Sequence, residues 1–178
     1  MTEQSLAIIK QAIGTIENYP KAGVTFRDIT PLLANAEALH VTIDLFKQRY
    51  QQQGITQIVG IEARGFIFGS ALAYALGVGF TLLRKPGKLP REVYSQRYAL
   101  EYGEDELQIH QDGLSADDKV VLIDDLLATG GTVLAAAELL KQTGATLHEA
   151  AFVIGLQDLA GIDRLDDKAI PYYTLCTF

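Results

Sequence analysis

The sequence has few cysteines, few basic residues and no long apolar runs, which several classes of protein require. Its 178 residues include one cysteine, Cys176, which excludes a disulfide framework and a metal site made of cysteine alone. Because Cys176 lies near the end of an apolar run, we interpret it as a small core residue. No apolar stretch approaches the roughly 20 residues that cross a bilayer, and no amino-terminal signal peptide is recognisable. We therefore expect a cytoplasmic protein with no membrane partner.

Positive charge is also scarce: 15 Lys and Arg stand against 22 Asp and Glu, a formal net charge of -7. A nucleic-acid-binding surface needs a basic stripe, so no nucleic-acid partner is expected. An anionic substrate would have to be held by cations that gather locally. The densest basic cluster is Arg84, Lys85, Lys88 and Arg91, on a stretch interrupted by glycine and proline. Taken alone, this cluster is typical of a solvated loop.

Several well-known functional motifs are missing from the sequence. There is no G-x-x-x-x-G-K-[ST] loop, no G-x-G-x-x-G turn after a strand and no G-x-S-x-G elbow. Kinase-like and Rossmann-type domains are therefore disfavoured. His40, His110 and His148 have no second ligand at metal-binding spacing, so we predict no protein-bound metal.

The residues present form a repeating pattern of helix and strand within a length typical of one domain, residues 1–178. Short apolar runs without polar alternation predict strands that are buried on both faces. The alternation favours an α/β fold with a central parallel sheet flanked by helices. We predict helices over 5–16, 36–53, 66–76, 131–142 and 158–165, and strands over 57–61, 79–83, 97–102, 106–110, 119–123, 147–154 and 172–176. Residues 18–30 are interpreted as a structured loop and 84–96 as an irregular polar stretch.

The strongest chemical signal follows the strand predicted over 119–123. Asp124 and Asp125 come directly after it, and small residues over 128–132 lead into a helix. Glycines allow a ligand to approach the backbone closely, and the unpaired amides and dipole of a helix amino terminus favour an anion. Carboxylates can accept hydrogen bonds from vicinal hydroxyls and stabilise positive charge. The pattern thus predicts a site for a phosphorylated ribose, although a plain strand–turn–helix junction capped by aspartates is the alternative.

This run resembles the phosphoribosyl-pyrophosphate signature of the type I phosphoribosyltransferases, and within them the adenine branch. The resemblance implies that family's fold, with a small amino-terminal hood (about residues 1–34) over the base. It implies that Asp124 and Asp125 contact the ribose hydroxyls. The residues implied to hold the 5′-phosphate are Ala128, Thr129, Gly130, Gly131 and Thr132.

Other segments extend the resemblance over nearly the whole chain. Residues 60–66 resemble the family's pyrophosphate loop, 84–90 its mobile loop and 100–103 the return of that loop, while 19–20 and 26–30 resemble the hood. The family implies a non-proline cis peptide between Glu62 and Ala63. Implied diphosphate contacts are Glu62, Ala63, Arg64, Arg84, Lys85 and Lys88; implied adenine contacts are Val24, Phe26 and Arg27; implied catalytic residues are Arg64, Glu101 and Tyr102.

Some of these residues also have simpler interpretations. Arg64 could be a surface arginine paired with Glu62, and Glu101 a charged residue at a hairpin edge. A catalytic Glu101 near the base would need a raised pKa, which burial beneath a closed loop could provide. Ala22 stands where the family commonly has proline.

The resemblance implies transfer of the phosphoribosyl group from 5-phosphoribosyl 1-pyrophosphate to adenine, which gives AMP and pyrophosphate. It implies Mg²⁺ that is carried on the pyrophosphate, with few direct protein ligands, and a homodimer. Two alternatives stay open at this point. One is the same chemistry on hypoxanthine, guanine, xanthine or orotate, and the other is a non-catalytic regulator that binds the sugar diphosphate.

Overall fold

The computed structural model describes residues 3–99 and 103–178, and its centre is a parallel sheet. The sheet has five strands in the order β4-β3-β7-β8-β9, all paired in parallel. This confirms the α/β fold predicted from the alternating pattern. The strands are β3 (Gln57–Ile61), β4 (Gly79–Leu83), β7 (Lys119–Leu127), β8 (Thr146–Gly155) and β9 (Tyr172–Thr177).

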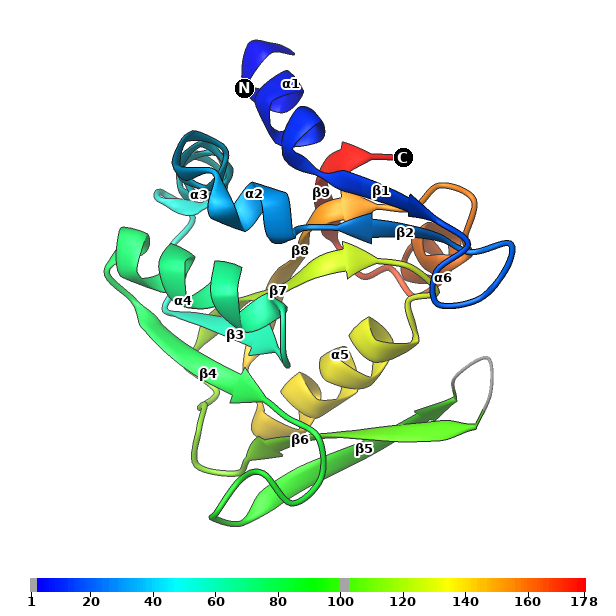
Figure 1. Ribbon diagram of the computed structural model, residues 1–178. Coiled ribbons are helices and arrows are strands. Elements are labelled where there is room, and N and C mark those ends of the chain that lie inside the picture. Colours follow the sequence, from blue (N-terminus) through cyan, green and yellow to red (C-terminus); the bar gives the residue numbers. More distant parts are fainter. Residues whose placement is uncertain (1–2, 100–102) are drawn as a thin grey trace.

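Helices cover both faces of the sheet (Figure 1). On one face α1, α2, α3 and α4 pack against side chains such as Ile58, Val121 and Val153. On the other face α5 and α6 pack against the neighbouring positions Val59 and Leu122. Successive strand residues point to opposite faces, which explains why these strands lack polar alternation. The helices are α1 (Glu3–Ala12), α2 (Thr30–Ala34), α3 (Ala36–Tyr50), α4 (Gly65–Leu76), α5 (Gly131–Thr143) and α6 (Gly161–Asp167). None of them, within the described ranges, is long and apolar enough to cross a membrane.

Two antiparallel strands form the amino-terminal hood, and here the sequence-based prediction was wrong. The helix predicted over 5–16 ends at Ala12, and the chain continues as β1 (Gly14–Glu17), which pairs with β2 (Thr25–Asp28) inside the predicted loop. Gly14 permits this pairing, because a Cβ built there would lie only 3.2 Å from Asp28 Cβ. Ile16 continues the helical spacing of the apolar residues, yet it lies on β1 with 43% of its surface exposed.

A second hairpin stands apart from the main sheet. Strands β5 (Val93–Ala99) and β6 (Glu104–His110) pair from Val93↔His110 to Ala99↔Glu104. The irregular stretch predicted over 84–96 is therefore wrong for its last four residues, which belong to β5. The hairpin packs against α5, and its buried side chains Leu107 and Ile109 join the core on that face (Figure 1).

Strand β7 is longer than predicted, and this changes the setting of the two aspartates. It runs to Leu127, so Asp124 and Asp125 lie within the strand and not after it. The ten-residue neighbour β8 supplies pairing partners as far as Leu127↔Gly155. On the other side, pairing with β3 stops at Gly60↔Ile123. The β3-facing edge of β7 is therefore free from Asp124 onward.

Candidate active site

The free edge of β7 lies where the order of the sheet reverses. The chain passes from β3 outward to β4 in one direction, and from β7 outward to β8 and β9 in the other. Ligands of open α/β sheets bind beyond the carboxyl ends of the strands at such a switch point. The segments predicted to hold the two phosphate-bearing ends of the substrate leave β3 and β7 at this point.

The loop after β3 is held close against β7. The peptide between Glu62 and Ala63 is cis, as the resemblance implied. Gly65 begins α4 directly beside β7, and a Cβ built there would lie 2.6 Å from Ile123 O and 3.0 Å from Asp124 Oδ1. Only glycine allows this approach, so the loop and the acid pair are fixed relative to one another.

Arg64 joins three parts of the site. Its Nε lies 2.9 Å from Asp125 Oδ2, and its guanidinium carbon lies 5.8 Å from the centroid of the Phe26 ring on the hood. The alternative pairing of Arg64 with Glu62 is not what the structure shows. The Arg64 N–H is not directed at Asp125 Oδ2, and this buried oxygen has no hydrogen-bond partner within the described part of the chain. The arrangement leaves both groups with unused hydrogen-bonding capacity.

Asp124, which is half-buried, and Asp125, which is buried, form a pair of neighbouring carboxyl groups. Asp125 is 2% exposed, and its backbone N–H donates to Asp124 Oδ1 at 2.9 Å. Burial, and then the neighbouring Asp125 carboxylate, raise the pKa of Asp124 well above its ordinary value. Burial also raises the pKa of Asp125, against the opposing effect of Arg64. A ligand that donates hydrogen bonds to these two carboxylates, or that carries positive charge near them, would stabilise their ionised form.

The turn between β7 and α5 presents unpaired backbone amides. Gly130 precedes the helix with a φ of 78°, a conformation that glycine adopts without strain. The Leu134 N–H donates to Gly130 O at 3.0 Å. Gly131, Thr132 and Val133 form the first turn of α5, ahead of this hydrogen bond. Their N–H groups therefore have no acceptor within the helix. This is the arrangement that the sequence predicted for an anion site.

The three hood residues predicted to contact adenine differ in what they contact in the structure. Phe26 stacks edge-on against Tyr19, with ring centroids 5.2 Å apart, and lies near Arg64. Arg27 instead donates to Thr15 Oγ1 at 2.6 Å, and its guanidinium lies 4.2 Å from the centroid of the Phe178 ring. Val24 closes the turn before β2, where its carbonyl accepts from Tyr19 N–H at 3.1 Å. Of the three, Phe26 is the side chain that contacts another predicted site residue.

The basic loop after β4 folds back onto the pyrophosphate loop. Arg84 Nε lies 3.1 Å from Glu62 Oε2, and Lys88 Nζ pairs with Glu62 Oε1. Lys85 points elsewhere, with its Nζ paired to Asp105 and donating to Tyr98 Oη at 2.8 Å. The structure therefore brings Arg84 and Lys88 to the site and directs the Lys85 side chain toward the hairpin. Glu101 and Tyr102 lie outside the described residues.

The phosphoribosyl transferase domain family matches residues 28–175, which include the acid pair, the turn and both loops. The chain belongs to this family. An adenine phosphoribosyltransferase of Idiomarina loihiensis is 58% identical over 176 residues, which cover 99% of both chains.

Solved structures agree with the fold of this phosphoribosyltransferase. The adenine phosphoribosyltransferase of Thermoanaerobacter pseudethanolicus is 43% identical, with a TM-score of 0.92 over 97% of this chain and 99% of that one. The Saccharomyces cerevisiae enzyme, solved with an imino-altritol bisphosphate and adenine, is 38% identical, with a TM-score of 0.92 over 98% and 100%.

Two residues behind the phosphate turn of the phosphoribosyltransferase domain were missed by sequence reasoning. Arg164 on α6 donates from Nη1 to Thr129 O at 3.1 Å. Gly161, at the start of α6, approaches so closely that a Cβ built there would lie 2.2 Å from Ala128 O. The sequence signal for this contact was an isolated glycine at a helix start. The residue that it contacts, Ala128, lies more than thirty residues earlier in the sequence.

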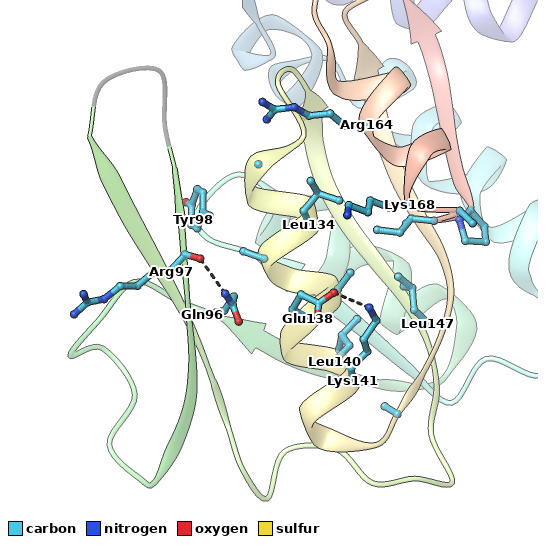
Figure 2. Close-up of a pocket in the computed structure, with 17 residues that line it drawn as sticks. Gln96, Arg97, Tyr98, Leu134, Glu138, Leu140, Lys141, Leu147, Arg164 and Lys168 are labelled. Atoms are coloured by element: carbon cyan, nitrogen blue, oxygen red, sulfur yellow. Dashed lines mark hydrogen bonds and ion pairs between the residues drawn. The ribbon is translucent and has the colours of Figure 1, made fainter.

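Arg164 also borders a cavity of about 670 Å³ between the β5–β6 hairpin, α5 and α6. Figure 2 shows α5 between the hairpin and α6, with Arg164 beside the first turn of α5. The cavity reaches Gly131 but none of the other predicted site residues. The acids and Arg64 mark the chemical centre of the phosphoribosyltransferase better than the cavity does, because they carry the convergent charged groups.

Replacing Arg164 by alanine should weaken binding of the phosphorylated sugar. The substitution removes a charge-assisted hydrogen bond to Thr129 O, so we expect KM for the sugar diphosphate to rise about fivefold, with kcat within about twofold of the parent. Steady-state kinetics would measure both. Lys168→Ala is the matched control, since it removes a cation from the end of the same helix and should leave KM unchanged. Equal effects of the two substitutions would contradict the role of Arg164.

Proposed function

We propose that this chain transfers the 5-phosphoribosyl group from 5-phosphoribosyl 1-pyrophosphate to adenine, which gives AMP and pyrophosphate in purine salvage. The observation that carries the proposal is the convergence of Arg64, the acid pair and the phosphate turn at one switch point. The choice of adenine rests on the adenine phosphoribosyltransferases to which the chain is similar over nearly its whole length.

The acid pair acts on the ribose. Asp124 and Asp125 accept hydrogen bonds from the two ribose hydroxyls, which satisfies the buried Asp125 Oδ2 that has no partner within the described part of the chain. As the bond to pyrophosphate breaks, positive charge develops on the anomeric carbon and its ring oxygen. The carboxylates stabilise this charge because they are already in place when it develops.

The two phosphate-bearing ends of the substrate are held by different means. Residues 128–132 hold the 5′-phosphate through backbone amides and hydroxyls. Ala63 and Glu62 contact the diphosphate through their backbone, and Arg64, Arg84 and Lys88 supply its cations. Lys85 was also predicted to contact the diphosphate, but its side chain is paired with Asp105 on the hairpin. Holding both ends fixes the anomeric carbon between them, so catalysis consists mainly of positioning and electrostatics.

The hood and the hairpin tip serve the base. Phe26 stacks on adenine, while Val24 and Arg27 present backbone groups to its polar edge. Glu101 is the hydrogen-bond partner of N7 of the base, and Tyr102 stays a predicted catalytic residue; both lie outside the described residues. Mg²⁺ would be carried on the diphosphate of the sugar substrate, whose oxygens are its preferred ligands. A homodimer in the cytoplasm stays a prediction.

One assay separates this proposal from its alternatives. The purified protein is incubated with the sugar diphosphate, Mg²⁺ and one base at a time, and pyrophosphate release is measured. We expect release with adenine and release at least about a hundredfold slower with hypoxanthine, guanine, xanthine or orotate, because a site that hydrogen-bonds one edge rejects bases that leave its groups unpaired. Release with another base but not adenine would move the chain to a different branch. Binding of the sugar diphosphate without release for any base would indicate a regulator.

A further inference from the structure

The Glu62 carboxylate is occupied entirely by the basic loop. Its side chain is 9% exposed, and both oxygens are engaged. Oε2 accepts from Arg84 Nε at 3.1 Å and from Lys85 N–H at 2.8 Å, and Oε1 accepts from Lys88 Nζ. One carboxylate on the pyrophosphate loop therefore binds three donors of residues 84–88.

Two of these donors are the cations that the proposed function gives to the diphosphate. A guanidinium binds carboxylate and phosphate oxygens with similar geometry, and an ammonium group attracts either one as a point charge. Burial alone would raise the pKa of Glu62, but the hydrogen bonds from Lys88, the Lys85 backbone and Arg84 outweigh it and hold the pKa below its usual value. Glu62 is therefore ionised at neutral pH and competes with an anionic ligand for these groups.

We propose that Glu62 is an internal counter-ion that holds Arg84 and Lys88 until the diphosphate displaces it. The inference rests on the proposed function, which places the diphosphate at these two cations. Part of the binding free energy of the diphosphate is then consumed in breaking the contacts with Glu62. The same contacts re-form when pyrophosphate leaves, which favours product release. Glu62 is therefore a positioning residue: it holds Arg84 and Lys88 in place and lowers the affinity of the site for the diphosphate.

The neighbouring pair of Arg91 and Asp112 offers a matched control. Arg91 belongs to the same basic cluster, and its Nη2 lies 3.0 Å from Asp112 Oδ1. No role in diphosphate binding is given to Arg91. Asp112, which follows β6, is thus a control: Asp112→Asn removes the same charge from a partner of the basic cluster without releasing Arg84 or Lys88.

The test compares Glu62→Gln with Asp112→Asn by titration calorimetry with magnesium pyrophosphate. We expect Glu62→Gln to bind at least threefold more tightly than the parent, and Asp112→Asn to bind within 1.5-fold of it. Steady-state kinetics should show a KM for the sugar diphosphate that falls by a similar factor in Glu62→Gln, with kcat equal or lower. Weaker or unchanged pyrophosphate binding by Glu62→Gln would overturn the proposal, as would an equal gain in Asp112→Asn.

A double-mutant cycle tests whether Glu62 acts through Lys88. In a Lys88→Met background, Glu62→Gln should change pyrophosphate affinity by less than about half of its effect in the parent. A full effect there would contradict the pairing. Glu62→Asp keeps the charge but shortens the reach, and it replaces Glu62→Gln if that variant fails to fold: we then expect Glu62→Asp to bind pyrophosphate more tightly than the parent, and parent-like or weaker binding would overturn the proposal. Absence of turnover in a parent protein that binds pyrophosphate would instead refute the proposed function, because the binding measurement is independent of turnover.

Discussion

Replacing Asp124 and Asp125 together by asparagine should lower kcat/KM by at least about tenfold, which corresponds to about 1.4 kcal/mol of lost transition-state stabilisation. Asparagine keeps the size of the side chain and part of its hydrogen bonding to the ribose hydroxyls. It lacks the negative charge that stabilises a cationic anomeric carbon, so the loss should fall mainly on kcat. Asp117→Asn, at an exposed residue in the turn before β7, is the control and should leave both constants unchanged.

The same acid pair should reduce the stability of the fold. Burial and the nearby Asp125 carboxylate raise the pKa of Asp124 above the value of about 3.9 expected in the unfolded chain. The folded chain then binds the proton more tightly, so the free energy of unfolding falls as the pH rises from about 4 through the raised pKa. Asp124→Asn should therefore be more stable than the parent at pH 7 by about 1 kcal/mol, or about 2–4 °C in Tm.

Thermal unfolding followed by circular dichroism between pH 4 and pH 8 would test this effect. The stability advantage of Asp124→Asn should be largest at neutral pH and should shrink as the pH falls toward about 4, where the folded parent carboxyl is protonated and the unfolded one is about half protonated. An advantage that is constant with pH, or an Asn variant less stable than the parent at pH 7, would show that the buried charge does not destabilise this site.

The sequence predicted the interior of the fold better than its periphery. Strands β3 and β4 begin and end where predicted. Strand β3 is buried on both faces, so its pattern depends on burial alone, whereas β4 lies at the edge of the sheet and is only partly buried. The hood strands were missed, since the pairing of Gly14 with Asp28 depends on a contact between segments that are each polar and short. The extension of β7 through Asp124 and Asp125 was missed for a similar reason: β8 supplies the pairing, and propensity disfavours aspartate in strands.

The candidate site was predicted at the level of segments but not of contacts. The cis peptide before Ala63 and the amide-rich turn at Gly130 are where the resemblance and the motif put them. That Arg64 pairs with Asp125, and that Glu62 pairs with the basic loop, follows from how β3, β4 and β7 lie beside one another. Such pairings are set by tertiary structure, which a single sequence does not record.

Gly161→Ala should have the largest effect of any substitution outside the predicted site. A Cβ at residue 161 would lie 2.2 Å from Ala128 O and 3.0 Å from Ala128 C, so the methyl group would meet backbone atoms that no rotamer change can move. Either α6 or the phosphate turn must shift. Because a misplacement of about 1 Å can reduce catalysis by about a hundredfold, we expect kcat/KM to fall by at least about tenfold, mainly through a higher KM for the sugar diphosphate.

The neighbouring residue supplies the control for this prediction. Ala160→Ser also adds one heavy atom, but residue 160 is exposed and forms the N-cap of α6, where serine is favoured. Its kinetics and Tm should match those of the parent, whereas Gly161→Ala should lose both sugar-diphosphate affinity and AMP affinity, measured by calorimetry. Parent-like AMP binding by Gly161→Ala would mean that the turn relaxes without losing its amide geometry. Gly161 contacts the turn at Ala128. Parent-like AMP binding would therefore also show that α6 is not needed to hold the phosphate turn in place.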